Sequence, residues 1–279
     1  MNKYFNVSLT KSYKSDMNNY NYNFDVASRL PPAATYFPLT NTATNPVYQN
    51  NGNTGQTING QTYTFVPNDG LYFDSPPTDF YMLLFNSSIN DSDLSLWNVS
   101  NITNMGYMFY VCTALTTLDL SLWDVSSVTN MEAMFSVCSS LTTINVSNWN
   151  VSSVTDMVNM FSSCSSLTTL DVSLWNVSSV TQMSAMFALC SSLTTLDLSL
   201  WNTSSVTHMG SMFMNCSLLT TINASNWDVS SVTDMPSMFQ NTTNFNENIS
   251  GWDVNNVTYW STFRTGSALT DPNTPPKFV

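Results

Sequence analysis

The sequence predicts an α/β solenoid, a stack of about seven 26-residue units that each contain a short strand and a short helix. Three observations predict it. Tryptophan recurs every 26 residues, cysteine keeps the same period, and each unit combines one stretch of strand periodicity with one of helix periodicity. The repeated tryptophans are Trp97, Trp123, Trp149, Trp175, Trp201 and Trp227, and Trp252 follows after 25 residues.

The first half of each unit, L-T-T-L-D-L-S, predicts a strand. Apolar and polar residues alternate there, as at Leu118, Asp119, Leu120 and Ser121. A period of two places alternate side chains on opposite faces of a strand. One face is therefore expected to be buried and the other to meet solvent.

The second half, T-x-M-x-x-M-F-x-x-C, predicts a helix. Its apolar residues fall at i, i+3, i+4 and i+7, as at Met105, Met108, Phe109 and Cys112, which form one stripe of a helix. Thr129 and its equivalents are predicted to be N-caps. One strand and one helix cannot bury their apolar sides alone, so stacked copies predict a parallel sheet on one side and helices on the other.

The repeats predict a solenoid over residues 78–264. Residues 78–88 resemble a degenerate helix half that caps the start, with Phe80, Leu83 and Leu84 at the apolar positions. Near the end of the stack, the repeat pattern changes at Thr242, Trp260 and Phe263. The proline-containing tail, residues 265–279, is expected to leave the stack.

Residues 1–77 differ from the repeats and predict a small, irregular β arm. They hold eight of the twelve tyrosines. QTINGQTYTFV at 56–66 predicts a hairpin about Asn59-Gly60, because Asn-Gly suits a two-residue hairpin turn. The remainder is interpreted as an arm that anchors or docks the solenoid through protein partners in an assembly.

The repeated motif L-T-T-L-D-L-S-L-W-N-V-S-S-V-T-x-M-x-x-M-F-x-x-C-S-S closely resembles the 26-residue repeat of bacterial surface proteins, the BspA-like branch of the leucine-rich repeats. The resemblance covers about residues 89–263. It implies a leucine-rich-repeat-like stack, surface exposure, adhesion and partner binding, and it brings no catalytic residues. Members usually carry a signal peptide or anchor, and this N-terminus lacks the apolar run that a secretory signal needs.

The distribution of charged and apolar residues argues against a nucleic-acid partner and against a membrane span. The net formal charge is -12, and the span 30–263 contains no Lys or Arg. Nucleic-acid binding requires such cations to neutralise phosphates, so no nucleic-acid partner is expected. No stretch approaches the roughly 18 apolar residues of a membrane-spanning helix, so no membrane span is expected either.

The outward face of the predicted strands is the candidate binding face. It comprises Thr117, Asp119, Ser121, Thr143, Asn145, Thr169, Asp171, Thr195, Asp197, Thr221 and Asn223. A solvated, hydrogen-bonded ladder is the leading interpretation. The alternatives are a weak Ca²⁺ site, an ice-binding threonine surface, and a carboxylate pair at Asp171 and Asp197. In that pair one pKa would rise, or the spacing would imitate that of a retaining glycosidase.

The other reactive side chains are interpreted as structural. Cys112, Cys138, Cys164, Cys190 and Cys216 are predicted to be buried free thiols, because equivalent helix positions lie too far apart for disulfides. The methionine columns are interpreted as core and not as a metal ladder. His208, the only histidine, is expected to face solvent without a catalytic partner. A second polar row, which follows each tryptophan, is interpreted as turn-forming Asx residues.

These observations predict a non-enzymatic, surface-displayed repeat protein without cofactor, metal or catalytic residues. A virion or particle component that presents a binding solenoid is the first hypothesis. A cell-surface adhesin or glycan-binding module is the alternative, with a host surface protein or glycan as partner. The predicted location is the virion or the extracellular surface. A homo-oligomer is one possible form of the assembly.

Overall fold

The computed structural model describes residues 56–58, 61–66, 70–73, 80, 84, 94 and 99–279. The strands of the N-terminal region form a three-stranded antiparallel sheet of β1 (Gln56–Ile58), β2 (Gln61–Val66) and β3 (Gly70–Phe73). Ile58 pairs with Gln61, so the predicted hairpin is confirmed, and β3 extends it to a meander. The rest of the predicted arm lies outside the described residues.

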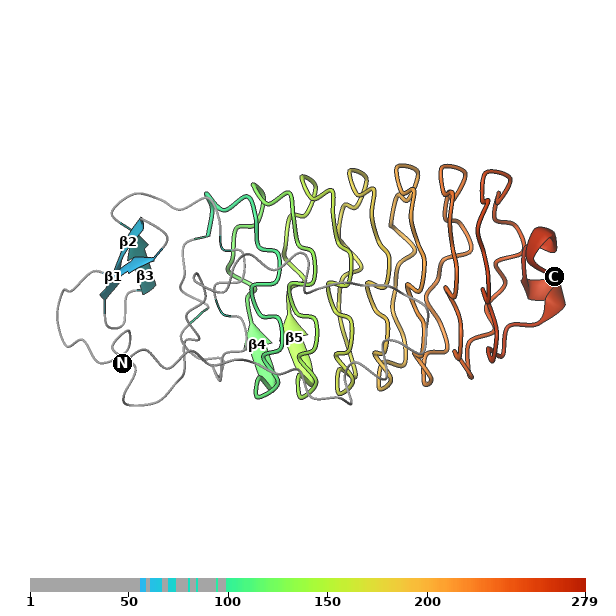
Figure 1. The fold of residues 1–279 in the computed structure, drawn as a ribbon, viewed down its shortest axis with the longest axis horizontal. Helices are drawn as coiled ribbons and strands as arrows, with labels where there is room; N and C mark the ends of the chain where they lie inside the picture. The colour runs from blue at the N-terminus through green and yellow to red at the C-terminus, as the bar shows by residue number, and fades with distance from the viewer. Residues whose placement is uncertain are drawn as a thin grey trace, which may run out of the picture. The chain divides into compact units, whose positions relative to one another are not determined.

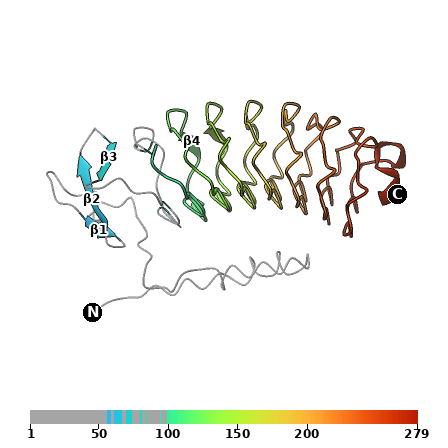
Figure 2. The same ribbon diagram turned by 90° about the horizontal axis from the view of Figure 1, so that it is seen from above.

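Residues 99–279 form a solenoid whose coils succeed one another along a single axis (Figures 1 and 2). Strands β4 (Thr117–Asp119) and β5 (Thr143–Asn145) pair in parallel, with Thr117 opposite Thr143. In both strands the middle residue is buried and its neighbours are exposed, as the alternation predicts. Elsewhere on this strand side, the pair Thr195–Thr221 forms a single parallel bridge.

The predicted helices are absent from the described coils, and consecutive turns take their place. In one coil, the N–H of Met134 donates to the carbonyl of Met131, and that of Cys138 donates to that of Phe135. The third residue of each turn is left-handed, with φ of 51° at Ala133 and 64° at Val137, as in type II turns. Thr129 is therefore no helix cap, and its hydroxyl instead donates to the Thr103 carbonyl in the preceding coil, at 3.1 Å.

The backbone hydrogen bonds explain why turns replace helices. Alternate N–H groups of one coil donate to the next, as from Ala133 to the Val158 carbonyl at 2.8 Å and from Phe135 to that of Met160 at 2.8 Å. In a helix these donors would bond within their own segment. Turns that repeat every four residues still direct positions i, i+3, i+4 and i+7 inward. The apolar spacing is thus met without a helix.

The core consists of columns that run along the solenoid. Phe135 and Phe161 stack at 5.4 Å between ring centroids, and Trp149 and Trp175 stack at 6.1 Å. The repeated tryptophans from Trp123 to Trp252 each donate the indole N–H to a carbonyl of the preceding coil, as Trp175 does to Val146 at 3.1 Å. The same identities recur because every coil must fill the same space beside its neighbours.

The stack continues toward the N-terminus beyond residue 99. Phe80 and Leu84 are buried, and their N–H groups donate to the carbonyls of Asn104 and Met108. They thereby extend the turn-side ladder by one coil. Phe80 and Leu84 are two of the three apolar residues on which the predicted start rests, and Leu83 lies outside the described residues.

The C-terminal tail was expected to leave the stack, and the structure corrects this. Two 3-10 turns, η3 (Asp271–Asn273) and η4 (Pro276–Phe278), cover the last coil (Figure 1). Phe278 is buried, with its ring centroid 4.6 Å from that of Phe263. Lys277 donates to the carbonyls of three residues of the last coil, at 2.6–3.1 Å, and lies over the Trp260 ring. The prolines thus end the repeat while the apolar tail seals its core.

Glu247 closes the strand side at the last coil. Its carboxylate accepts the N–H groups of Ile222, Asn223 and Ala224 at 2.9–3.1 Å. Those donors face the position where a further strand would otherwise lie. Edge donors of this kind invite pairing with another chain when they are left open. The carboxylate therefore takes the place of a neighbouring strand.

Replacing Glu247 with alanine is expected to lower the free energy of unfolding by about 1–3 kcal/mol, because three backbone donors lose a charged acceptor. Urea unfolding followed by circular dichroism measures the change. Asn244→Ala on the same coil removes one exposed side-chain hydrogen bond, from Asn244 to the Ser217 carbonyl, and should change the value by less than about 0.5 kcal/mol. Equal effects of the two variants would refute the role given to Glu247.

Candidate binding surfaces

The candidate binding face lies on the strand side, where the sequence analysis placed it. The alternating burial directs leucine or isoleucine inward and directs the threonine and Asx residues outward. The exposed members are Thr117, Asp119, Thr143, Asn145, Thr169, Asp171, Thr195, Asp197, Thr221 and Asn223, whereas Ser121 is half-buried. The structure therefore brings these predicted residues together as two rows, one of hydroxyls and one of carboxylates and amides.

Local hydrogen bonds hold the carboxylates of the first Asx row. Asp119 accepts the N–H of Ser121 at 3.0 Å, and this bond is the main cause that lowers the Asp119 pKa. Asp197 accepts the backbone N–H of Ser199 and the side-chain amide of Asn223, each at 3.2 Å. The side chain of Ser199 is the main cause that lowers the Asp197 pKa. The pKa of Asp197 is thus lowered, the opposite of the rise expected for a crowded carboxylate pair.

The second Asx row, which follows each tryptophan, consists of turn-forming residues, as predicted. Asp124 accepts the N–H of Ser126 at 3.1 Å, and Asp228 accepts that of Ser230 at 3.0 Å. In both cases the serine side chain is the largest cause that lowers the pKa of the aspartate. Asn150, Asn176 and Asn202 make the same backbone contact two residues on. Aspartate and asparagine are therefore interchangeable in this row.

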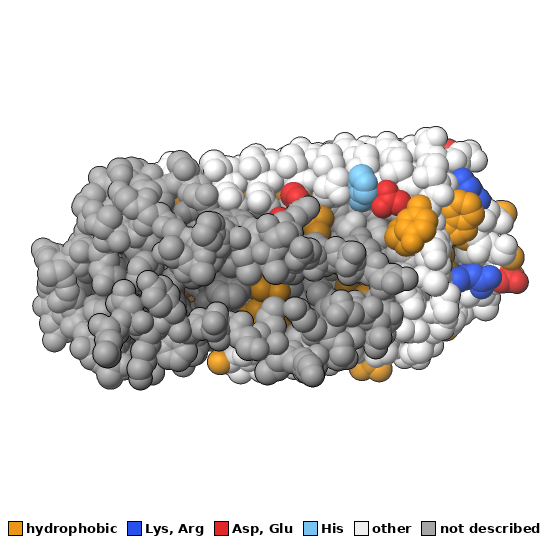
Figure 3. Space-filling view, in the orientation of Figure 1, with side chains coloured by type: hydrophobic (Ala, Val, Ile, Leu, Met, Phe, Trp, Pro, Cys, Tyr) orange, Lys and Arg blue, Asp and Glu red, His pale blue; other side chains and the backbone are white. Residues whose placement is uncertain are grey.

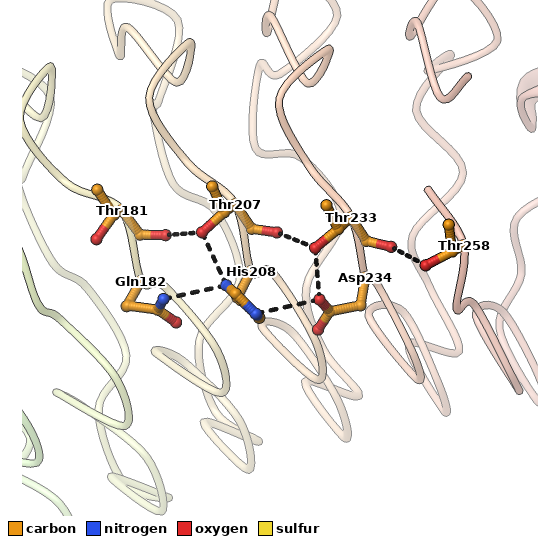
Figure 4. A network of polar contacts seen from close by, with 7 residues as sticks. All are labelled: Thr181, Gln182, Thr207, His208, Thr233, Asp234 and Thr258. Carbon is orange, nitrogen blue, oxygen red and sulfur yellow. Dashed lines mark hydrogen bonds and ion pairs between the residues drawn. The ribbon is translucent and has the colours of Figure 1, made fainter. Parts of the chain in front are cut away.

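His208 has partners that the sequence analysis did not give it (Figure 4). Its Nε2 lies 3.3 Å from Oδ2 of Asp234, and its Nδ1 lies 3.0 Å from Nε2 of Gln182 and 2.8 Å from Oγ1 of Thr207. Gln182, His208 and Asp234 belong to one column of parallel bridges, spaced by 26 residues. That spacing was the signal by which the His208–Asp234 contact could have been found.

The His208 cluster is better explained as a hydrogen-bond network than as a catalytic triad. The Gln182 amide donates to Nδ1, which leaves the proton on Nε2 facing Asp234. The Thr207 hydroxyl also contacts the Thr181 carbonyl at 3.1 Å, as Thr233 contacts Thr207 in turn. Thr207 is therefore part of a row that links coils. Figure 3 shows the histidine on the surface beside an acidic side chain, with hydrophobic side chains further toward the C-terminal end.

Within the part of the chain that the structure describes, no three His, Cys, Asp or Glu side chains gather as a metal site would require. Nor does any helix there have the length and hydropathy of a membrane-spanning segment. The five cysteines are free and buried, which agrees with the prediction. Each thiol donates to a carbonyl of the preceding coil, as Cys164 does to Phe135 at 3.2 Å.

A family model described as "Mycoplasma protein of unknown function, DUF285" matches residues 78–195 and 167–273. No curated protein matches the sequence at a significant level. A leucine-rich cell surface protein from Faecalibacterium prausnitzii is similar in structure at 17% identity and a TM-score of 0.39, over 79% of this chain and 56% of that one. This chain thus spans little more than half of that protein's length.

Two further solved structures show a similar degree of likeness. A leucine-rich repeat protein from Eubacterium ventriosum is 18% identical with a TM-score of 0.37, over 77% of this chain and 52% of that one. A leucine-rich repeat protein of T. pallidum is 17% identical with a TM-score of 0.30, over 62% of this chain and 80% of that one.

Proposed function

The chain belongs to the family described as Mycoplasma protein of unknown function, DUF285, and on this premise we propose that it is a non-enzymatic repeat protein that binds a partner through the strand face of its solenoid. The matched stretches span residues 78–273, which contain the repeats that resemble the BspA-like leucine-rich repeats. That resemblance is confirmed.

The strand face carries this proposal because its outward side chains are exposed and polar in coil after coil. Hydroxyl, carboxylate and amide groups recur there from coil to coil, about 4.8 Å apart where the coils pair as strands, as at β4 and β5. A surface that is regular along its length suits an extended partner, such as a host surface protein or a glycan. Solenoids commonly bind through such extended surfaces.

The regularity of the columns favours binding over catalysis. A catalytic site needs a nucleophile, a base and an orienting group in one irregular arrangement. The described acidic residues of the strand face instead contact serines two residues on, in the same way from coil to coil. A binding surface can use such repetition, whereas a reaction centre cannot.

The proposed location is the exterior of the cell. The family is described from mycoplasmas, which are cells, and this favours display on a cell over the virion that the sequence analysis preferred. Residues 1–77 are proposed to attach the solenoid to its carrier through protein partners. Fractionation tests the location: recovery from purified particles and not from cell envelopes would restore the virion version.

The binding test replaces Asp119, Asp171 and Asp197 together with alanine. Attachment of the full chain to host cells is expected to fall at least about tenfold, because three exposed polar groups leave one face. The matched control, Asp124, Asp228 and Asp253 to alanine, removes the same charge and the same kind of turn contact from the other row. The proposal fails if the native chain does not attach, or if the two triple variants attach equally.

A further inference from the structure

The repeats fall into two classes that differ on the strand face and at the corner that follows it. Where the first Asx row has aspartate, the residue three positions on is leucine: Asp93 with Leu96, Asp119 with Leu122, Asp171 with Leu174, and Asp197 with Leu200. Where the row has asparagine, that residue is asparagine or glycine: Asn145 with Asn148, Asn223 with Asn226, and Asn248 with Gly251. All seven repeats follow the rule, so charge and an apolar side chain occur together.

The corner leucines are not required by the fold. Leu122, Leu174 and Leu200 are 72%, 74% and 69% exposed. Asn148 and Asn226 occupy the same place in otherwise equivalent coils, where the buried tryptophan follows in the same way. A side chain that points into solvent and can be exchanged for asparagine contributes little to the core. The leucines therefore call for an explanation outside the packing of the stack.

The aspartates beside these leucines have no cationic partner among the described residues. The ion pair Arg264–Asp271 and the contact of His208 with Asp234 involve other aspartates. The span 30–263 contains no Lys or Arg, so the coils themselves supply no counter-charge. The coils with aspartate and leucine thus present carboxylate and exposed apolar surface together, without internal neutralisation.

Two coils of this class are neighbours, and they form the leucine–aspartate doublet of Asp171, Leu174, Asp197 and Leu200. Asp171 and Asp197 lie in successive coils of the stack, as do Leu174 and Leu200. The two coils are in contact beside the doublet, because Trp201 donates its indole N–H to the Val172 carbonyl at 3.0 Å. Two carboxylates and two leucines therefore share one short stretch of the surface. Lys and Arg side chains match this pattern, because their stems lie on apolar surface while their heads reach a charge.

We propose that the leucine–aspartate doublet binds a basic, aliphatic polypeptide segment of a partner protein. This inference rests on the proposed function and names the partner class for that same face. Lysine or arginine of the partner contacts Asp171 and Asp197, and its aliphatic side chains cover Leu174 and Leu200. A glycan would use the hydroxyl and carboxylate rows and would gain little from two exposed leucines.

The test exchanges one repeat class for the other, which the scaffold itself shows to be compatible with the coil. The variant Asp171→Asn, Leu174→Asn, Asp197→Asn, Leu200→Asn converts both coils of the doublet. The probe is a fluorescent peptide of alternating lysine and leucine, followed by anisotropy with the full chain at physiological salt. Binding is expected to weaken at least about tenfold.

Two further variants separate charge from apolar contact. Leu174→Asn with Leu200→Asn keeps every charge and is expected to weaken the lysine–leucine peptide severalfold without affecting a lysine–serine peptide. Asn145→Asp with Asn148→Leu converts the intervening coil, joins Leu122 to the doublet in one row, and is expected to strengthen binding. Circular dichroism verifies that each variant keeps the native fold.

The outcomes distinguish this inference from the proposed function. The doublet is overturned as a specific site if the Leu174→Asn, Leu200→Asn variant binds the lysine–leucine peptide as tightly as the native chain. It is also overturned if added salt weakens peptide binding of the native chain as much as the fourfold exchange does, because binding would then depend on charge alone. The doublet is overturned as well if the triple alanine variant of Asp119, Asp171 and Asp197 loses host-cell attachment while the fourfold asparagine variant of the doublet keeps it. Failure of the native chain to attach to host cells overturns the proposed function itself.

Discussion

Raising the pH from 8 to 10 is expected to lower the free energy of unfolding by about 5 kcal/mol through the buried thiols alone. Burial raises the pKa of Cys190 to about 12 and that of Cys138, Cys164 and Cys216 well above 9.0. Neighbouring thiols of the column add to the rise for the latter three. Urea unfolding followed by circular dichroism between pH 7 and 10 measures the change.

The sign follows from which state releases protons. Below pH 9 the thiols are protonated in the folded and the unfolded chain, so their contribution to stability is complete. Above pH 9 the unfolded chain loses these protons while the folded chain keeps them, and the equilibrium shifts toward unfolding. The loss grows as the pH rises from about 9 toward 12, and each thiol contributes about 1.4 kcal/mol at pH 10.

The variant Cys190→Ser isolates the thiol contribution from that of other groups that titrate in this range. Serine keeps the donor that Cys190 directs at the Phe161 carbonyl, at 3.1 Å in the native chain, but it does not titrate. The decrease between pH 8 and 10 is expected to be smaller by about 1.4 kcal/mol. A pH dependence identical to that of the native chain would show that Cys190 ionises as readily in the folded state as in the unfolded state.

Trp175→Ala is expected to lower the free energy of unfolding by about 3–5 kcal/mol. Its side chain is 1% exposed, stacks on Trp149 with the rings 6° from parallel, and donates to the Val146 carbonyl. Alanine would leave a cavity between two coils and remove one of the two hydrogen bonds to the Val146 carbonyl, which also accepts the backbone N–H of Trp149 at 3.1 Å. Because each coil contacts only its neighbours, the loss weakens the interface on which both halves of the stack depend.

The neighbouring residue provides the control for Trp175. Leu174→Ala changes an apolar side chain of the same coil that is 74% exposed, and it should alter stability by less than about 0.5 kcal/mol. Urea unfolding monitored by circular dichroism suits both variants, because tryptophan fluorescence changes with the substitution itself. If both variants unfold at the same urea concentration, the tryptophan column does not hold the coils together.

The candidate face could be located from sequence because it depends on alternation alone. Once Leu118 is inside, Thr117 and Asp119 must point outward, and the 26-residue period aligns them with Thr143 and Asn145. The contact of His208 with Asp234 follows from the same period, yet it becomes evident only when the bridge column places those residues side by side. Their side-chain geometry depends on rotamers that no sequence period specifies.

By itself, the sequence determined the stack, its inward columns and its outward polar rows, because each of these follows from periodicity and the need to bury apolar side chains. Only the tertiary structure decided between helix and turn in the Met-Phe-Cys segment, since both place Met131, Met134, Phe135 and Cys138 inward. Turns form because the carbonyls of the neighbouring coil accept backbone N–H groups that would bond within the segment in a helix. The position of Phe278 was likewise decided by tertiary structure. The last coil has no further coil beside it, and the ring of Phe278 packs on Phe263 and covers its core.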